Sequence, residues 1–532
     1  MRKTKLTRRG FLGGTLAGLV SARTGRRAWA APGPATAATA SVEAVPGERI
    51  ATIAPECYGH FAEHLGGVIY DGIWVGQDSP VANIGGIRKS LVDWMKRLRP
   101  AVIRWPGGCF ADGYHWRDGV GPRERRPRRY GRWHDAVEPN HFGTHEFVRF
   151  CRLVGAEPYI AANVGTGSPQ EFHEWMEYAN APAGTTTLAD ERASHGSPEP
   201  FRVRYWGVGN ESWGCGGKFT PEDYCAHYRR FTEWLPSFGV PLFLIASGPS
   251  SNDLSWTNRF FRKWTDGARA PLHGWSPHYY CGTAGEALRF TNDQWYELIA
   301  RAADIERLIT DQWSALESYD PRHEVRLCID EWGTWHKGGT EVNPRHLYGQ
   351  QSCLRDALIA ALTLDTFNRH ADKVAMGNIA QLINCLQSLF LADGDRFVAT
   401  ANFYVFEMYK PHQGAAAVRC HVQAPALTFA VGPEKRQVFG LAGSASLVEK
   451  NLTLTLVNPS LADACAARVQ LRQANARTVR MTVLTHAEPN AHNSFDRPEE
   501  ITPKTSETAL SGSSFVLELP AKSIVRCDIE LG

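Results

Sequence analysis

Three acidic residues each come directly after an apolar run of the chain. Glu63 ends the run YGHFAE, Glu211 follows RYWGVGN, and Glu331 follows RLCID. A carboxylate at the end of an apolar strand either caps the next helix or takes part in proton chemistry, and for a single residue capping is the more common role. Two carboxylates that meet can hydrolyse a glycosidic bond: one protonates the leaving oxygen, and the other attacks the sugar or activates water.

Whether these carboxylates meet depends on the elements that carry them. From about residue 55 to 395, an apolar strand, a glycine-rich loop and an amphipathic helix alternate, which predicts a (β/α)₈ barrel with insertions. A doubly wound open sheet is the alternative, but no G-x-G-x-x-G follows the first strand. The expected strands are Tyr58–Glu63, Ala101–Trp105, Pro158–Val164, Val203–Asn210, Leu242–Ser247, Gly274–Tyr280, Val325–Glu331 and Ala375–Ile383.

The active site of such a barrel lies at the carboxyl ends of its strands. Glu63 ends the first expected strand, Glu211 the fourth and Glu331 the seventh, so all three should face one pocket. Residues that could stack on sugar rings or bind hydroxyls lie near the same strand ends, although each aromatic residue is as often a packing residue. They are Trp105, Trp116, Asn210, Trp213, His278, Tyr279, Tyr280, Trp332, Trp335 and Gln381.

The pattern changes toward the C-terminus. Residues 55–400 are assigned to the barrel, and alternating apolar runs within residues 401–532 predict a C-terminal antiparallel β-sandwich. Residues 42–54 are expected to add one strand to that sandwich, and residues 31–41, rich in Ala, Pro and Thr, predict a linker.

The first 30 residues indicate a targeting segment. They hold eight Lys and Arg and no acidic residue, and Thr7-Arg8-Arg9-Gly10-Phe11-Leu12 precedes an apolar run too short to span a bilayer. Ala28-Trp29-Ala30 offers small residues for cleavage after Ala30. We therefore expect a twin-arginine-type signal and export to the periplasm or beyond; an unprocessed basic N-terminus is the alternative.

Charge, hydropathy and cysteine usage argue against a nucleic-acid-binding protein, an integral membrane protein and a metalloprotein. Lys and Arg number 58 against 55 Asp and Glu, and without the leader they number 50 against 55, which gives no sign of a nucleic-acid partner. After the leader, the sequence has no run of about 18 apolar residues, so we do not expect integration into a membrane. Twelve cysteines without a C-x-x-C are expected to be mostly core thiols, and His60 and His64 lack the H-E-x-x-H arrangement, so we expect no metal or cofactor.

Several segments, taken together, resemble glycoside hydrolase family 51, the α-L-arabinofuranosidases. In order they are GHFAEHLGGVIYDGIWVG, IRWPGGCFADGYHWRDGVGP, YWGVGNESWGCGG, DEWGTW and NIAQLIN. The resemblance implies a retaining exo-enzyme that removes terminal arabinofuranose from arabinose-containing glycans such as arabinan or arabinoxylan side chains. It also implies a homo-oligomer, often a hexamer. An export signal is a departure from many relatives.

The resemblance also implies a role for particular residues. Glu211 matches the acid/base and Glu331 the nucleophile. The matches to substrate-binding residues are Glu63, Cys109, Asn210, Tyr280, Trp335 and Gln381. Of these, Glu63 and Gln381 would bind hydroxyls, and Cys109 lies in a loop that touches the sugar, at a position that is Asn in some members.

Three other functions remain open from the sequence. A related retaining barrel glycosidase, such as an endoglucanase or β-xylosidase, would use the same two carboxylates. A non-catalytic carbohydrate-binding protein would bind without hydrolysis, and a metal-dependent barrel hydrolase would lose activity to a chelator.

Overall fold

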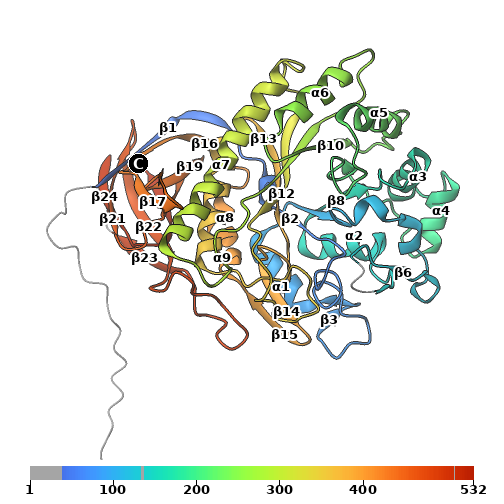
Figure 1. The fold of residues 1–532 in the computed structure, drawn as a ribbon, viewed down its shortest axis with the longest axis horizontal. Coiled ribbons are helices and arrows are strands. Elements are labelled where there is room, and N and C mark those ends of the chain that lie inside the picture. Colours follow the sequence, from blue (N-terminus) through green and yellow to red (C-terminus); the bar gives the residue numbers. More distant parts are fainter. Residues whose placement is uncertain (1–38, 134–136, 509) are drawn as a thin grey trace, which may run out of the picture. The chain divides into compact units, whose positions relative to one another are not determined.

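A closed barrel of parallel strands organises the protein. The computed structural model describes residues 39–133, 137–508 and 510–532. Eight strands pair in parallel, and β13 pairs with β2 to close the ring (Figure 1). They are β2 Gly59–Phe61, β5 Val102–Trp105, β8 Glu157–Ala162, β9 Tyr205–Val208, β10 Phe243–Ser250, β11 Gly274–Tyr280, β12 Arg326–Gly333 and β13 Val374–Ala380. The predicted fold class is confirmed.

Helices surround the barrel. They are α1 Lys89–Leu98, α2 Thr144–Val154, α3 Pro169–Asn180, α4 Thr187–Ser194, α5 Pro221–Thr232, α6 Leu254–Trp264, α7 Asn292–Glu317, α8 Leu354–Arg369 and α9 Ala401–Tyr409. The helices α3 and α5 begin in the same way: Ser168 and Thr220 each accept a hydrogen bond from a backbone N–H, and a proline takes the first helical position.

The barrel interior changes from apolar to polar toward the carboxyl ends of the strands. Near the amino ends of the strands, the interior is filled by apolar side chains, including Val102, Tyr205, Ile245 and Met376. Short two-stranded sheets decorate the connecting loops: β3 Asn83–Ile84 with β4 Ile87–Arg88, β6 Arg129–Tyr130 with β7 Val137–Glu138, and β14 Phe390–Asp393 with β15 Arg396–Ala399.

The C-terminal domain is one nine-stranded sheet in the order β23-β22-β25-β20-β19-β16-β1-β21-β24. Its pairs are antiparallel except β1 with β21, which is parallel. Residues 42–54 were expected to add an early strand to this domain, and most of them lie in β1, next to β16. The strands are β1 Ala40–Thr52, β16 Ala416–Gln423, β19 Ala442–Val448, β20 Asn451–Asn458, β21 Cys465–Leu471, β22 Ala476–Thr485, β23 Lys504–Thr508, β24 Ser514–Leu519 and β25 Ser523–Leu531.

Helix α9 begins at residue 401, where the C-terminal domain was expected to begin. It packs against α8 and α1, and the first strand of the large sheet after it is β16. Nearly all residues of α9 are buried. A helix that is apolar on every side has no amphipathic period, and this is why the pattern did not reveal it.

Helix α8 lies between the barrel and the sheet. Its Asp365 is buried and accepts hydrogen bonds from the hydroxyls of Ser444 (2.7 Å), Thr455 (2.6 Å) and Tyr409 (2.9 Å). Burial raises the pKa of Asp365 to about 6, because these neutral donors only partly replace water around the carboxylate.

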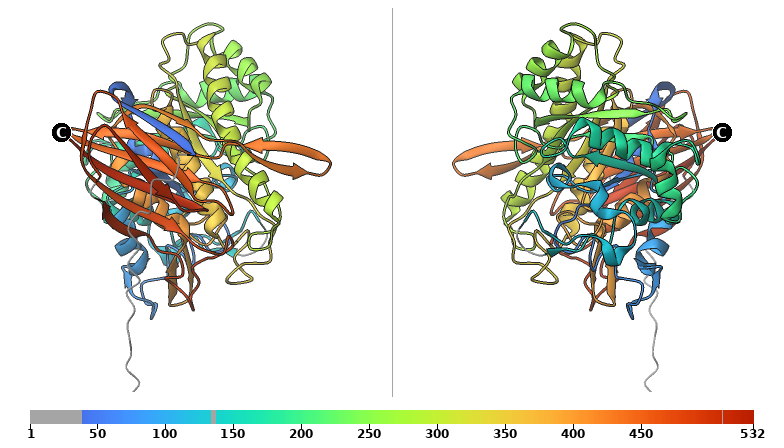
Figure 2. Two further views of the ribbon diagram at one scale, coloured as in Figure 1. Left: turned by 90° about the vertical axis from the view of Figure 1, so that its left-hand side faces the viewer. Right: turned by 90° about the vertical axis from the view of Figure 1, so that its right-hand side faces the viewer.

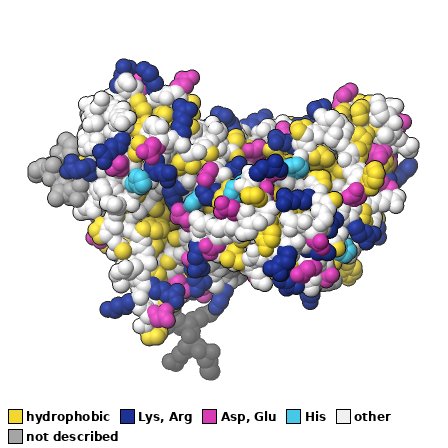
Figure 3. Space-filling view, turned by 90° about the horizontal axis from the view of Figure 1, so that it is seen from above, with side chains coloured by type: hydrophobic (Ala, Val, Ile, Leu, Met, Phe, Trp, Pro, Cys, Tyr) yellow, Lys and Arg dark blue, Asp and Glu magenta, His cyan; other side chains and the backbone are white. Residues whose placement is uncertain are grey.

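The surface shows no region of a single charge on the face drawn in Figure 3, where basic and acidic side chains are interspersed. The hairpin of β17 Leu427–Val431 and β18 Glu434–Val438 projects from the body and packs at its base on α7 (Figure 2). Within the described residues, no helix is both long enough and apolar enough to cross a bilayer.

Candidate active site

Asp330 and Glu331 both face the interior of the barrel, although adjacent residues of a regular strand point to opposite faces. The pairing register of β12 shifts between Ile329 and Trp332. Such an irregularity re-aims side chains. Glu331 is only 5% exposed, and its carboxylate accepts hydrogen bonds from Arg104 Nη1 at 2.7 Å and from the Tyr280 hydroxyl at 2.9 Å.

Glu211 lies on a tight turn after β9. Its φ of 37° lies in the left-handed region, which a residue other than glycine rarely adopts. Asp112 holds this turn: the Asn210 N–H donates to one carboxylate oxygen of Asp112 at 3.0 Å, and the Val164 and Gly165 N–H groups donate to the other. Burial raises the pKa of Asp112 to about 7. Backbone strain of this kind persists where the surroundings enforce it, often at functional sites.

The two strand ends bring Glu211 and Glu331 together. A carboxylate oxygen of each, together with a ring nitrogen of His278, lie within 4.8 Å of one another. The carboxyl groups of retaining glycosidases are about 5–5.5 Å apart, whereas inverting enzymes need roughly 6.5–9.5 Å to admit a water molecule. The arrangement therefore fits a nucleophile and an acid/base.

His278 connects these carboxylates to Asp330. Its Nδ1 lies 3.0 Å from Glu211 Oε1, and its Nε2 lies 3.1 Å from Asp330 Oδ1. Burial lowers the pKa of His278, but Glu331, Asp330 and Glu211 outweigh that effect and raise it to about 10. The imidazolium form can donate to both neighbours, so each ring nitrogen of His278 is engaged by a carboxylate.

Arg104 is the second cation of the site. Its guanidinium donates to Glu331 and, through Nη2 at 2.7 Å, to Oδ1 of Asn210, and it forms an ion pair with Asp330. Burial raises the pKa of the Asp330 carboxyl, but Arg104 and His278 hold it well below its usual range. Burial also raises the pKa of Glu331, and His278 and Arg104 oppose that rise.

Glu63 and Gln381 form a second polar cluster at the same end of the barrel. The N–H groups of Gly108 and Phe110 donate to Glu63 Oε1 at 3.1 and 2.9 Å, and Gln381 Nε2 donates to Oε2 at 3.3 Å. Burial, followed by the charge of Glu331, raises the pKa of Glu63 to about 7. At Gly108 a Cβ atom would lie 2.6 Å from Glu331 Oε1, so only glycine lets the loop pass between the two glutamates.

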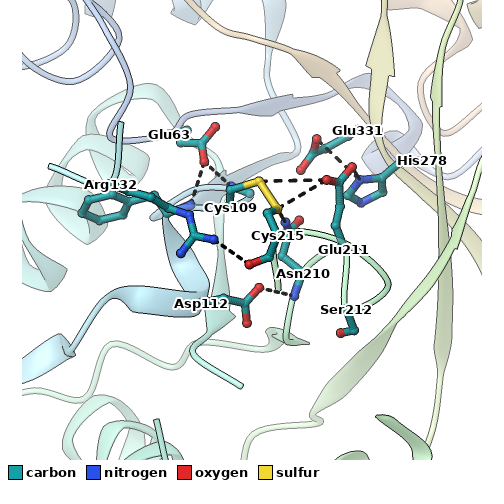
Figure 4. The surroundings of a disulfide bond; sticks show 12 residues. Glu63, Cys109, Asp112, Arg132, Asn210, Glu211, Ser212, Cys215, His278 and Glu331 are labelled. Atoms are coloured by element: carbon teal, nitrogen blue, oxygen red, sulfur yellow. Dashed lines mark hydrogen bonds and ion pairs between the residues drawn. A yellow bond between two sulfur atoms is a disulfide. The ribbon is translucent and has the colours of Figure 1, made fainter. Parts of the chain in front are cut away.

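A disulfide joins Cys109 to Cys215, and so links the loop after β5 to the loop after β9 (Figure 4). Sγ of Cys215 lies 3.5 Å from Oε2 of Glu211, and Sγ of Cys109 lies 4.0 Å from the same oxygen. Arg132 donates to the backbone carbonyl of Cys215 at 2.6 Å. The predicted substrate-binding Cys109 is thus covalently tied to the turn that carries Glu211.

The aromatic residues near the strand ends divide into two groups. Trp105, Trp116 and Trp332 are buried in the core and cannot stack on a ligand. Trp335 is 38% exposed, and its ring centroid lies 5.3 Å from that of Tyr280 and 5.1 Å from that of Tyr348. Trp335 therefore forms an open wall beside the carboxylate pair.

All eight site residues expected from the sequence lie around one barrel end. Those that sequence reasoning missed as site residues are Arg104, Asp112 and Cys215. Arg104 had a usable signal, because a charged residue in the middle of the apolar strand AVIRW must find a buried partner. Asp112 and Cys215 lie in irregular loops, where no periodicity indicates the direction of a side chain.

Known proteins share this architecture. Residues 94–281 match the family model described as Alpha-L-arabinofuranosidase 1 domain, and residues 330–523 match Alpha-L-arabinofuranosidase C-terminal domain. The intracellular exo-alpha-L-arabinofuranosidase of Bacteroides ovatus is 37% identical over 502 residues, which cover 93% of this chain and 96% of the relative. The chain belongs to glycoside hydrolase family 51.

A solved structure agrees with this family assignment. The GH51 arabinofuranosidase from Xanthomonas axonopodis pv. citri superposes with a TM-score of 0.88 at 36% identity, covering 93% of this chain and all of that one. The family resemblance expected from the sequence is therefore confirmed, and the chain is a glycoside hydrolase.

The expectation of export is wrong. The Bacteroides ovatus relative is named intracellular, and so is the exo-alpha-(1->5)-L-arabinofuranosidase of Streptomyces lividans, which is 28% identical over 86% of this chain and 70% of the relative. The expected signal and its cleavage position fall on residues 1–30, which lie outside the described part of the chain.

Proposed function

We propose that this family 51 member is an exo-acting α-L-arabinofuranosidase that releases terminal arabinofuranose with retention of configuration. The observation that carries the proposal is the approach of Glu211 and Glu331 to within 4.8 Å of each other at the barrel mouth. The name of the Bacteroides ovatus relative supports the exo-acting specificity. The proposed substrates are arabinose side chains of arabinan or arabinoxylan.

In the first step, Glu331 attacks the anomeric carbon, and the bond from that carbon to the leaving oxygen breaks. Hydrogen bonds from Arg104 and Tyr280 fix both oxygens of Glu331, which limits its freedom before attack. Glu211 gives its proton to the leaving oxygen. Because His278 donates to Oε1 of Glu211, the proton to be transferred is carried by Oε2.

In the second step, water displaces Glu331 from the anomeric carbon. Glu211, which has given up its proton in the first step, accepts a proton from the attacking water. The same side chain therefore serves as acid and then as base. Asp330 and His278 hold it in one orientation through both steps.

The remaining predicted residues would bind the sugar. Glu63 and Gln381 each keep hydrogen-bonding capacity for hydroxyls after their mutual contacts. Arg104 donates to Oδ1 of Asn210, so the amide N–H₂ group of Asn210, which lies 3.8 Å from Cys215 Sγ, is the group that would donate to the 2-hydroxyl. We assign Tyr280 and Cys109 to contacts with the ring, and Trp335 to the wall of the pocket.

Activity on a panel of aryl glycosides tests the proposed function. Wild type should hydrolyse an aryl α-L-arabinofuranoside and neither an aryl β-D-xyloside nor a β-glucan, and Glu331→Ala should be inactive on all three. Faster hydrolysis of the glucan or the xyloside than of the arabinofuranoside would favour a related glycosidase, an endoglucanase or a β-xylosidase. Binding of arabino-oligosaccharides without turnover would favour a carbohydrate-binding protein, and loss of activity to a chelator would favour a metal-dependent hydrolase.

We further propose a homo-oligomeric assembly, as the resemblance implies. Sedimentation equilibrium at several concentrations tests it, and a single species with the 59.0 kDa mass of one chain would contradict it.

A further inference from the structure

The active-site disulfide is partly accessible to solvent, unlike nearly all other cysteines of the described chain. Cys109 and Cys215 are half-buried. Of the ten cysteines that are free in the described residues, nine are buried, and only Cys420 is partly exposed. A small dithiol can therefore reach the Cys109–Cys215 bond in the folded protein, because thiol–disulfide exchange requires access to a sulfur atom.

A third donor faces the two sulfur atoms. Ligand atoms of Cys109, Cys215 and Glu211 lie within 4.8 Å of one another, and no ion lies among them. The nearest oxygen is Oε2 of Glu211, since Oε1 is bound to His278. Figure 4 shows the sulfur atoms between Glu63 on one side and Glu211 with His278 on the other.

Two thiolates and one carboxylate are a ligand set for zinc. Tetrahedral zinc binds sulfur at about 2.3 Å, so its two sulfur ligands are about 3.8 Å apart. The Cα atoms of Cys109 and Cys215 are 5.5 Å apart, and rotation of the freed side chains can supply that sulfur separation without moving the backbone. A water molecule or a substrate oxygen would take the fourth position.

We propose that reduction of the Cys109–Cys215 bond creates a binding site for a thiophilic divalent cation, zinc, held by both cysteines and Glu211. A dithiol supplies two electrons and two protons, the S–S bond breaks to give two thiols, and the reagent becomes a cyclic disulfide. Zinc then binds as the two thiols lose their protons. The oxidised protein lacks the thiolates, so zinc binding depends on the redox state.

Zinc at this site would stop hydrolysis. The metal would occupy Oε2 of Glu211, the oxygen that carries the transferred proton in the proposed mechanism. The inhibition therefore rests on the proposed function, whereas the metal binding does not. A second group, Glu211 with His278 and Glu331, also lies within ligand distance but is the same in both redox states. Comparison of the oxidised and reduced forms separates the two sites.

The test compares metal binding to the full chain before and after anaerobic treatment with a dithiol, which is then removed. Co²⁺ serves as the optical probe, because cobalt bound to thiolate has a near-ultraviolet charge-transfer band, and Zn²⁺ is used for activity. The reduced protein should show the band with about one ion per chain, and Zn²⁺ should lower its hydrolysis of an aryl arabinofuranoside at least about tenfold, reversibly with a chelator. The oxidised protein should show neither effect.

Variants identify the ligands. Cys215→Ser and Cys109→Ser should each weaken the band strongly, and Glu211→Gln, which keeps both thiols, should lower the affinity for Co²⁺. Cys420→Ser is the matched control, because it removes the other reachable thiol, and it should keep the full band. Absence of the band in reduced wild type, or an equal band in Cys215→Ser, would overturn the site.

Activity data separate this proposal from the proposed function. A full band with unchanged hydrolysis in Zn²⁺ would overturn the inhibition and leave the proposed activity standing. Absence of hydrolysis in the oxidised, metal-free protein would be a failure of the proposed function alone, since the band does not depend on it.

Discussion

Nδ1 of His278 lies 3.0 Å from Oε1 of Glu211. This contact fixes the orientation of the proposed acid/base and leaves its other oxygen free to carry the proton. On the far side of the ring, Asp330 accepts from Nε2 and keeps the imidazole in place. His278 thus has two effects, one geometric and one electrostatic, and they can be measured separately.

Replacing His278 with Gln should move the acidic limb of the pH–activity profile to higher pH. The cation at His278 lowers the pKa of Glu331, so its removal should raise that pKa, and the nucleophile should then ionise only at higher pH. A shift of about one pH unit in kcat/KM is expected. An acidic limb that does not move would contradict the electrostatic effect of His278.

If Glu211 is the general acid, the loss of activity in Glu211→Ala should depend on the leaving group of the substrate. Glu211→Ala should reduce hydrolysis of arabino-oligosaccharides by about 10²–10⁴-fold, because their alkoxide leaving groups need a proton. Aryl arabinofuranosides with an activated phenol should lose much less in the step that forms the ester. Equal losses on the two substrate classes, measured as kcat/KM, would contradict the assignment of Glu211.

The arrangement of the strands was predictable because it rests on local patterns. Each expected strand overlaps an observed one, and the positions of Glu63, Glu211 and Glu331 at their ends required only the rule that parallel barrels carry their sites there. The orientation of the side chains was not predictable. Asp330 and Glu331 share the barrel interior only because β12 is irregular, which a period of two does not indicate.

Contacts between residues far apart in the chain could not be predicted from the sequence either. The disulfide connects two loops that are 106 residues apart, and spacing alone could not select Cys109 and Cys215 from twelve cysteines. Helix α9 was not predicted, because its burial on every side removes the polar face that a helical pattern needs. Both features depend on tertiary contacts that have no local signal.

The exposed wall of the pocket should affect binding more than chemistry. Trp335→Ala removes a ring that contacts both Tyr280 and Tyr348. We expect a loss of about 1.5 kcal/mol for ligand surface buried against it, which corresponds to a roughly tenfold higher KM for oligosaccharides at similar kcat. Steady-state kinetics on arabino-oligosaccharides tests this, and a fall in kcat with unchanged KM would contradict it.

Asp365 should make the contact between barrel and sheet sensitive to pH. Its pKa is about 6 in the folded protein, above the value of about 3.9 expected for an unfolded chain. The stabilising effect of its protonated form is therefore complete below pH ~4 and is lost as pH rises through 6. The corresponding change in the free energy of unfolding is about 3 kcal/mol.

Asp365→Asn cannot ionise and should remove this dependence. The difference in apparent Tm between variant and wild type, measured at one scan rate, should shift in favour of the variant between pH 4 and pH 7. Ser444, Thr455 and Tyr409 can reorient their hydroxyls toward an amide. Parallel Tm curves for the two proteins over that range would show that Asp365 does not titrate there.

In the proposed mechanism, Glu331 forms a covalent bond to the sugar while Glu211 transfers the proton. A mechanism-based arabinofuranosyl inhibitor carrying fluorine at carbon 2 and a good leaving group slows release of the intermediate, so the labelled peptide can be sequenced by mass spectrometry. We expect one label per chain, on Glu331, and none in Glu331→Gln. A label on Glu211 or Glu63, or an unlabelled enzyme whose natural product has inverted configuration, would contradict it.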